Sequence, residues 1–75
     1  MDIREHDLVA LTQSLPTHRL AAGDVGTVVH VYANGLQYEV EFFDPQRNTI
    51  AIVTLALENI RRGGARNVSR AGRVA

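Results

Sequence analysis

The amino-acid sequence predicts an all-β protein, a small five-stranded barrel, and three observations lead to this prediction. Apolar and polar residues alternate with a period of two, which is the period of a strand that buries one face. β-branched residues concentrate between turn signals made of Gly, Pro, Asn and Asp. The chain has 75 residues and no cysteine, so one small core must stabilise it without disulfides. Closing the sheet into a barrel would hide its edges.

The first two expected strands are separated by a long loop. Residues 7–11 form a short first strand, and residues 25–32, with four valines, form the clearest strand of the chain. The segment between them contains Pro16 and Gly23 and has mixed polarity, which indicates a loop longer than a two-residue hairpin. The Gly-x-x-Gly spacing of residues 23–26 is interpreted as a structural turn in which positive φ angles favour glycine.

Two hairpins are expected next. The Asn34-Gly35 pair supplies the two positive φ angles that a type I′ turn requires. Residues 37–42 then alternate strictly, so Tyr38, Val40 and Phe42 should face the core and the residues between them should face water. Residues 43–48 contain Asp-Pro and an Asn and form the second hairpin connection.

The last part of the expected domain is a strand, a turn and a short strand. Residues 49–55 are apolar on both faces, which is typical of a central strand or of one covered by the tail or by a partner. Residues 56–59 are too short for an α-helix and indicate a 3₁₀ turn before a brief strand around Ile60. Together these elements describe a Src-homology-3-like barrel over residues 1–61.

The C-terminal residues form a basic tail. Residues 62–75 are rich in Gly, Arg and Ala and carry few bulky apolar side chains, so we expect this tail to be disordered. The formal net charge is zero, yet residues 1–60 hold all eight acids and only three arginines, whereas residues 61–75 hold five arginines and no acid. The chain is therefore an acidic body with a basic tail.

The body resembles an uncharacterised family of stand-alone small bacterial barrels of Src-homology-3-like type. The resemblance covers residues 5 to 61 and is carried by five stretches: Asp7-Leu8-Val9-Ala10-Leu11, Leu15-Pro16, Gly23-Asp24-Val25-Gly26-Thr27-Val28-Val29, Tyr38-Glu39-Val40-Glu41-Phe42 and Val53-Thr54-Leu55. That family is a domain of unknown function, so the resemblance implies the barrel fold and no chemistry. More loosely, the third stretch is similar to the KOW motif of ribosomal and transcription-factor barrels and to the barrel of nitrile hydratase β subunits.

The sequence offers no constellation typical of an enzyme. It contains no Gly-x-Ser-x-Gly, Gly-Lys-Ser/Thr or His-Glu-x-x-His motif and no cysteine nucleophile. His6, His18 and His30 are spaced by twelve, which is not a metal-ligand spacing. We therefore expect a non-catalytic protein with no metal and no cofactor. The charged N-terminal residues and the short apolar runs predict a soluble cytoplasmic protein that does not enter a membrane.

The expected function is a protein-interaction module that docks onto one partner protein, as an accessory subunit or in an antitoxin-like role. Small size, an acidic body and a doubly apolar fourth strand, with Ile50, Ile52 or Val53 partly exposed, support this interpretation. The candidate partner-binding residues are His18, Arg19, Glu39, Glu41 and Ile52. The first two lie in the long loop that borders the usual groove of such barrels. The two glutamates share one strand face, which is either plain hydrated surface or an acidic surface for a basic partner.

The alternative is a KOW-like nucleic-acid-binding barrel assisted by the basic tail. Its candidate contacts to phosphate are Arg61, Arg62, Arg66, Arg70 and Arg73. The tail lacks aromatic residues for base stacking, and the acidic body would repel phosphate, so the sequence favours the protein-interaction module. A homodimer that buries the fourth strand also fits the sequence.

Overall fold

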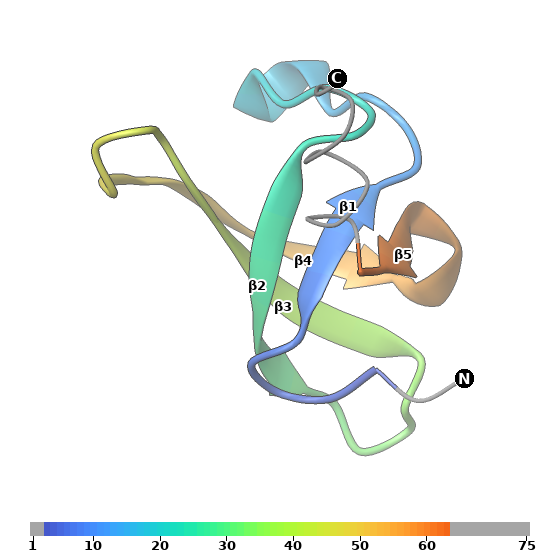
Figure 1. Cartoon of the computed structure of the whole chain (residues 1–75). Helices are drawn as coiled ribbons and strands as arrows, with labels where there is room; N and C mark the ends of the chain where they lie inside the picture. Colours follow the sequence, from blue (N-terminus) through green and yellow to red (C-terminus); the bar gives the residue numbers. More distant parts are fainter. Residues whose placement is uncertain (1–2, 64–75) are drawn as a thin grey trace.

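The computed structural model describes residues 3–63, and these residues form one antiparallel β-sheet of five strands (Figure 1). The strands are β1 (Leu8–Leu11), β2 (Val25–Val31), β3 (Gln37–Phe43), β4 (Thr49–Ala56) and β5 (Ile60–Arg62). Two short 3₁₀ turns, η1 (Pro16–His18) and η2 (Leu57–Asn59), are the helical elements of this part of the chain. The all-β prediction is confirmed, and so is the 3₁₀ turn before the last strand. Neither turn is long and apolar enough to cross a membrane.

The sheet is open, which corrects the prediction of a closed barrel. The strands are ordered β4-β3-β2-β1-β5, so within residues 3–63 β4 and β5 form the two edges. The sheet bends around its core, and η2 carries the chain from one edge to the other (Figure 1). All three residues of β5 pair with β1, and β5 and β4 are not paired with each other.

The core lies on the concave face of the sheet. Its largest fully buried side chains are those of Phe42, Leu11, Val9, Val28 and Val40. The predicted alternation of β3 is confirmed, because Tyr38, Val40 and Phe42 are at most 3% exposed while the residues between them are partly exposed. β-branched and aromatic residues fit such a half-buried pleated surface, which explains why these segments form strands.

The strand β4 lies at an edge and is not central, contrary to one expectation from its sequence. It pairs with β3 alone within the described chain. Ile50 and Ile52 are 48% and 58% exposed and Val53 is partly buried, so the predicted partial exposure is confirmed. The apolar residues on both faces of β4 therefore do not mean that a strand lies on each side of it. Of the predicted tail, residues 62–75, Arg62 belongs to β5 instead of to a disordered segment, and the residues from Gly64 onward lie outside the described part of the chain.

The hairpin between β2 and β3 is confirmed, but its turn is not type I′. Gly35 has a φ of 70°, whereas Asn34 is not among the residues with positive φ. The N–H of Gly35 donates to the carbonyl oxygen of Tyr32 at 2.8 Å, and Asn34 Oδ1 accepts from the N–H of Leu36 at 2.8 Å. The loop is therefore a β-turn that ends at a glycine in the left-handed conformation. Loops of this kind are the next most common hairpin connections after the two-residue turns.

Gly23 and Gly26 are required for different reasons. Gly23 has a φ of 94°, which confirms the structural turn before β2. Gly26 lies within β2 and has no positive φ, which corrects the expectation for this glycine. A Cβ atom at Gly26 would lie 2.7 Å from Val40 Cγ1 and 2.9 Å from the carbonyl oxygen of Glu41. Glycine is needed there because β3 passes too close for any side chain.

The long loop between β1 and β2 is held by backbone hydrogen bonds. Leu15 and Leu20 form an isolated bridge around η1, and Leu20 is buried in the core. The N–H of Gly23 donates to Leu11 O at 2.8 Å, which returns the chain to the end of β1. The exposed tip of this loop, with His18, is therefore fixed at one end of the sheet.

Candidate functional site

The outer face of β3 and β4 brings together three of the residues predicted to bind a partner. Glu41 is the direct cross-strand partner of Ile52, and Glu39 is that of Thr54. Because Tyr38, Val40 and Phe42 face the core, the alternation of β3 places both glutamates on the opposite side of the sheet. We call Glu39, Glu41, Ile52 and Thr54 the outer β3–β4 face.

Two hydroxyl groups hold the Glu39 carboxylate in place. Its Oε2 accepts hydrogen bonds from the Tyr32 hydroxyl and from Thr54 Oγ1, the latter at 2.8 Å. The hydrogen bond from Tyr32 is the main cause that lowers the pKa of Glu39, and the bond from Thr54 adds to it. The same bond raises the pKa of the Tyr32 phenol. Glu39 is therefore a fixed anion, the opposite of a carboxyl group kept protonated for acid catalysis.

The Glu41 carboxylate is held in a similar way. Its Oε2 accepts a hydrogen bond from Thr49 Oγ1 at 2.7 Å. None of the side-chain hydrogen bonds of the described residues uses the Oε1 atom of either glutamate. The outer β3–β4 face therefore presents two oriented acceptors beside Ile52, which is 58% exposed. Such a surface fits a ligand with one apolar and one basic group.

The predicted pair His18 and Arg19 does not belong to this face. Both residues are exposed and lie at the end of η1, and Arg19 takes the left-handed conformation with a φ of 59°. No hydrogen bond or ion pair within residues 3–63 joins either of them to Glu39 or Glu41. The structure thus divides the five predicted partner-binding residues between two places.

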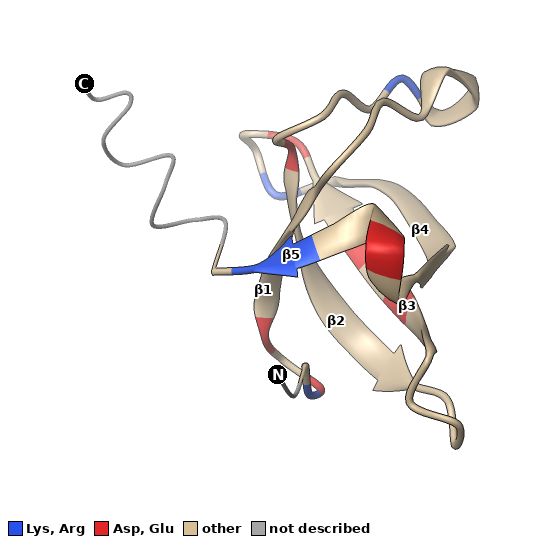
Figure 2. Ribbon diagram, turned by 90° about the vertical axis from the view of Figure 1, so that its right-hand side faces the viewer, with Lys and Arg blue, Asp and Glu red and all other residues tan. Residues whose placement is uncertain are grey.

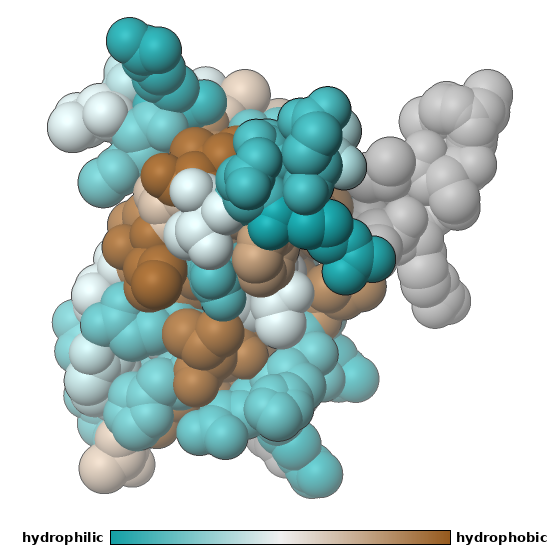
Figure 3. All heavy atoms as spheres, turned by 90° about the vertical axis from the view of Figure 1, so that its left-hand side faces the viewer, coloured by the Kyte–Doolittle hydropathy of each residue, from teal (hydrophilic) through white to brown (hydrophobic). Residues whose placement is uncertain are grey.

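A second surface at the base of the β3–β4 hairpin was missed by the sequence analysis. Two shallow hollows of about 200 and 320 Å³ share Val25, Phe43 and Asp44 in their walls. Leu8, Phe43 and Ile50 line these hollows and are 44%, 41% and 48% exposed. Figure 3 shows hydrophobic side chains gathered in a band on the side from which the β3–β4 loop projects. Consecutive residues of a strand face opposite sides, so the pair Phe42-Phe43 was the sequence signal for an outward aromatic residue.

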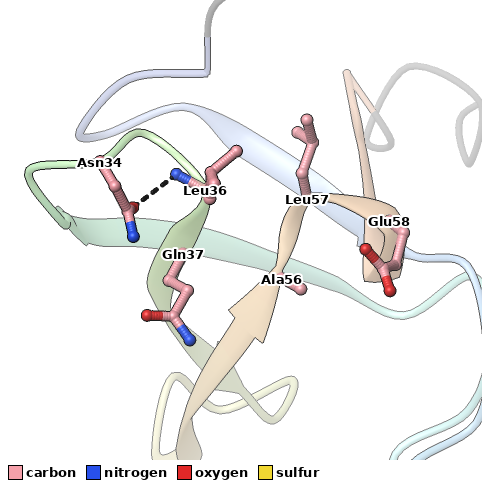
Figure 4. A pocket seen from close by; sticks show the side chains of 6 residues that line it. All are labelled: Asn34, Leu36, Gln37, Ala56, Leu57 and Glu58. Atoms are coloured by element: carbon pink, nitrogen blue, oxygen red, sulfur yellow. Dashed lines mark hydrogen bonds between the residues drawn. The ribbon is translucent and has the colours of Figure 1, made fainter.

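An open groove of about 550 Å³ lies between the β2–β3 loop and η2 (Figure 4). It is lined by Asn34, Leu36, Gln37, Ala56, Leu57 and Glu58. Leu36 and Leu57 are 57% and 39% exposed, and the N–H of Leu57 donates to Leu36 O at 3.2 Å. Glu58 is the only ionisable residue in this lining, so the groove offers apolar contact and one negative charge. Its residues are far apart in the sequence, and no sequence pattern indicated it.

The basic residues predicted for nucleic acid are only partly within the described chain. Arg61 and Arg62 are exposed on β5 (Figure 2), and Arg62 Nε lies 4.0 Å from Asp7 Oδ2. Arg66, Arg70 and Arg73 lie outside the described residues. Arg47, at the tip of the β3–β4 loop with a φ of 72°, is a further exposed cation that the sequence analysis did not single out.

The histidines are scattered over the surface. His30 Nδ1 lies 3.8 Å from Glu5 Oε2, and its ring packs edge to face against Tyr32 with the ring centres 4.7 Å apart. Within residues 3–63 no three side chains of His, Cys, Asp or Glu are grouped so that they could hold a metal ion. The structural role of His30 is therefore to pack against Tyr32, whose hydroxyl donates to Glu39.

Comparison with known proteins supports the family resemblance. The sequence profile of one protein family, described as Domain of unknown function (DUF4926), matches residues 5–62. The match includes every strand of the described sheet and both 3₁₀ turns. Neither the curated proteins nor the solved structures gave a match. Because the profile covers most of its 75 residues, this chain belongs to the DUF4926 family.

Proposed function

We propose that this chain is a non-catalytic protein-interaction module that docks onto a partner protein through the β3–β4 hairpin, as an accessory subunit or in an antitoxin-like role. The observation that carries the proposal is the exposure of Phe43, Ile50 and Ile52, three large apolar side chains from one hairpin. Fully burying a side chain of this kind stabilises an interface by roughly 1.5–3 kcal/mol. Phe43 and Ile50 line one hollow, and exposed apolar side chains gathered in this way are typical of interaction sites.

The charges beside these residues define the kind of partner. Glu39 and Glu41 lie on the outer β3–β4 face directly beside Thr54 and Ile52. A partner that places apolar side chains on Ile50 and Ile52 can therefore reach the two carboxylates with Arg or Lys. Charge complementarity of this kind contributes mainly to specificity and association rate.

We also infer that the open sheet has the strand topology of a Src-homology-3-like fold. The strand order, the long loop after β1 and the 3₁₀ turn before β5 support this inference. In this open arrangement β4 and the β3–β4 hairpin remain accessible, which is consistent with docking through them.

Affinity purification of the tagged chain from its native cells tests the proposal. We expect one stoichiometric protein partner that is retained when residues 64–75 are removed. Ile50→Arg should abolish its capture, whereas Val29→Arg should not. Val29 is a matched control because it is 41% exposed and lies on β2. If both variants capture the partner equally, the β3–β4 hairpin is not the docking surface.

The alternative function, a KOW-like nucleic-acid-binding barrel, is supported by the exposed Arg61 and Arg62 on the last strand. Binding of the chain to single-stranded and double-stranded oligonucleotides should then weaken steeply with salt concentration. It should also be lost when residues 64–75 are removed. A nucleic acid recovered with the intact chain but not with the shortened one would favour this alternative over protein docking.

A further inference from the structure

The two edges of the sheet are built very differently. β5 has three residues, of which two are arginines, and Figure 2 shows this basic edge in blue. Short length and charge are the usual means of preventing an edge strand from pairing with another chain. β4 has eight residues, Thr-Ile-Ala-Ile-Val-Thr-Leu-Ala, with no charge, proline or glycine. A strand of this length and composition has the properties of one that pairs with a further strand.

The hydrogen-bond alternation shows which backbone groups of β4 face outward. The N–H of Leu57 donates to Leu36 O, which extends the β3–β4 register by one pair. Because bonded and non-bonded pairs alternate in an antiparallel ladder, the groups of Val53 and Leu55 face β3 and those of Ile52 and Thr54 face away. The N–H of Ala56 also faces away and is taken by Asn59 Oδ1 at 3.1 Å. Within residues 3–63 β4 pairs with β3 alone, so the outward groups of Ile52 and Thr54 have no neighbouring strand to bond.

We propose that a second copy of this chain occupies the β4 edge, with the two β4 strands antiparallel about a two-fold axis. From Ile52 to Ala56, beyond the bulge at Ile50, the outward groups lie on even-numbered residues, so in this part of β4 the two copies must pair even with even. This condition leaves two registers near the middle of the strand: one pairs Ile52 with Ile52 of the other copy, and one pairs Ile52 with Thr54. Both registers place uncharged residues opposite uncharged residues along the whole of β4.

Charge complementarity at the ends of the strand selects this occupant. Arg47 lies in the loop just before β4 and Glu58 in η2 just after it, so antiparallel pairing brings Arg47 of one copy toward the end of the strand at which Glu58 of the other copy lies. Arg47 and Glu58 are both exposed, and no ion pair within residues 3–63 uses either of them. The two-fold axis repeats this contact, so at each end of the paired strands Arg47 of one copy lies near Glu58 of the other (Figure 4 shows Glu58). A dimer of this kind also gives a small domain additional stability.

This inference concerns the backbone edge of β4, whereas the proposed function concerns the outer side chains of the β3–β4 hairpin. A dimer through β4 leaves Glu39 and Glu41 on the outer face and places two copies of that face in one continuous sheet. The dimer and the docking of a partner protein are therefore compatible, and each can fail without the other.

Sedimentation velocity of the full chain over a wide concentration range tests the dimer. We expect a reversible shift to twice the mass of the 8.2 kDa chain. Thr54→Pro should abolish the shift because it removes an outward N–H, a position at which an edge strand tolerates proline. Thr54→Ala is the matched control, since it removes the hydroxyl bonded to Glu39 but keeps the N–H. It should dimerise like the parent chain, and circular dichroism should show that both variants are folded.

Charge reversal gives a second test that leaves the strands unchanged. Arg47→Glu and Glu58→Arg should each weaken the dimer, by on the order of a few-fold to tenfold for two equivalent pairs. The double variant should restore dimerisation, because the pair is then reversed in both copies. Restoration is not expected if either residue acts only on folding of its own chain.

Two results would overturn the inference: a chain that is monomeric at every concentration, or a dimer that is unchanged by both Thr54→Pro and the single charge reversals. A monomer that still captures a partner through Ile50 would refute the dimer and leave the proposed function intact. A dimer that captures no partner would do the reverse.

Discussion

At the scale of single residues, Gly26 is the position where the addition of one methyl group should most reduce the stability of the fold. A methyl group there would lie 2.7 Å from Val40 Cγ1 and 2.9 Å from both Glu41 O and Phe42 Cδ1. The side chain of Val40 can turn, but the carbonyl group of Glu41 can move only with its strand. We expect Gly26→Ala to lower the free energy of unfolding by about 1–3 kcal/mol. In a thermal melt, each kcal/mol corresponds to a Tm lower by about 4–8 °C for a domain of this size.

Gly35→Asn is the control for this prediction. Gly35 has a φ of 70° with nothing within 4 Å of an added Cβ, and Asn is one of the few residues that adopt this conformation. Its Tm should change little. An equal loss of Tm in both variants would show that glycine flexibility, and not the close approach of β3, explains Gly26.

Tyr32 controls the ionisation of Glu39. The hydrogen bond from its hydroxyl is the main cause that lowers the pKa of Glu39, so Tyr32→Phe should bring this pKa back toward the ordinary glutamate value. A carboxyl group whose pKa is lowered by folding stabilises the fold above its unfolded pKa, and this contribution is lost as the pH falls through the folded pKa. The stability of Tyr32→Phe should therefore fall less between neutral and acidic pH than that of the parent chain.

The measurement for Tyr32→Phe is the carbon chemical shift of the Glu39 carboxyl group, followed by NMR as the pH is lowered. Thr54→Ala should raise the same pKa by a smaller amount, because the Thr54 bond is the lesser of the two causes. A Glu39 pKa that is the same in the parent chain and in Tyr32→Phe would contradict the hydrogen bond.

The sequence predicted which residues face the core more reliably than which residues of different strands contact each other. The period of two placed Tyr38, Val40 and Phe42 in the core, because burial of one face is a local property of a strand. The contact between Glu41 and Ile52 needed the exact register of two strands, which a bulge at Phe42 and Phe43 shifts by one residue. The groove between Leu36 and Leu57 depends on the direction in which the chain leaves β4 at η2, and no local sequence pattern predicts that direction.

At the scale of elements, the β3–β4 loop depends on Asp44. Its Oδ1 accepts from the N–H groups of Gln46 and Asn48, both at 2.9 Å, and its Oδ2 accepts from Asn48 Nδ2 at 3.3 Å. These bonds, led by the N–H of Asn48, lower the pKa of Asp44. We expect Asp44→Ala to reduce the urea concentration at the midpoint of unfolding. Asp44→Asn should reduce it less, because its amide oxygen still accepts from the backbone.

If the two Asp44 variants lose the same stability, the negative charge matters and the backbone hydrogen bonds do not. Repeating the urea titration in high salt separates these causes, since salt screens an exposed charge and leaves short hydrogen bonds nearly unchanged.

The strands themselves followed from the sequence, but two features of their connection did not. The Asn34-Gly35 pair correctly marked a hairpin, yet the longer loop needs only one left-handed residue, at Gly35, so the type I′ prediction was wrong. The expectation that the apolar fourth strand is central was wrong, because β4 lies at an edge, whereas the alternative that the tail or a partner covers it stays a prediction. Composition reports how much apolar surface a strand carries, and it does not report which molecule buries that surface.

At the scale of the whole molecule, the open sheet explains why a small chain has several exposed apolar surfaces. Within residues 3–63, the edge strands β4 and β5 are connected by η2 but are not paired with each other, so the outer edge of β4 has no neighbouring strand. A closed barrel would have covered the β4 edge with the last strand. The proposed docking and the proposed dimer therefore both use surface that this topology leaves open.

The last strand, although short, should be necessary for folding, and the residues after it should not. Among residues 3–63, the members of the hydrophobic core run from Ile3 to Ile60, so a chain ending at Gly63 should keep the circular dichroism spectrum and the Tm of the full chain. A chain ending at Asn59 loses Ile60, which is 5% exposed, together with the whole ladder between β1 and β5. Removing a buried aliphatic side chain alone costs about 2–5 kcal/mol. A single core of this size supplies only about 3–5 kcal/mol, so the chain ending at Asn59 should be unfolded at room temperature. A cooperative melt of that shorter chain would show that β5 is dispensable, and a lower Tm for the chain ending at Gly63 would show that residues 64–75 contribute to the fold.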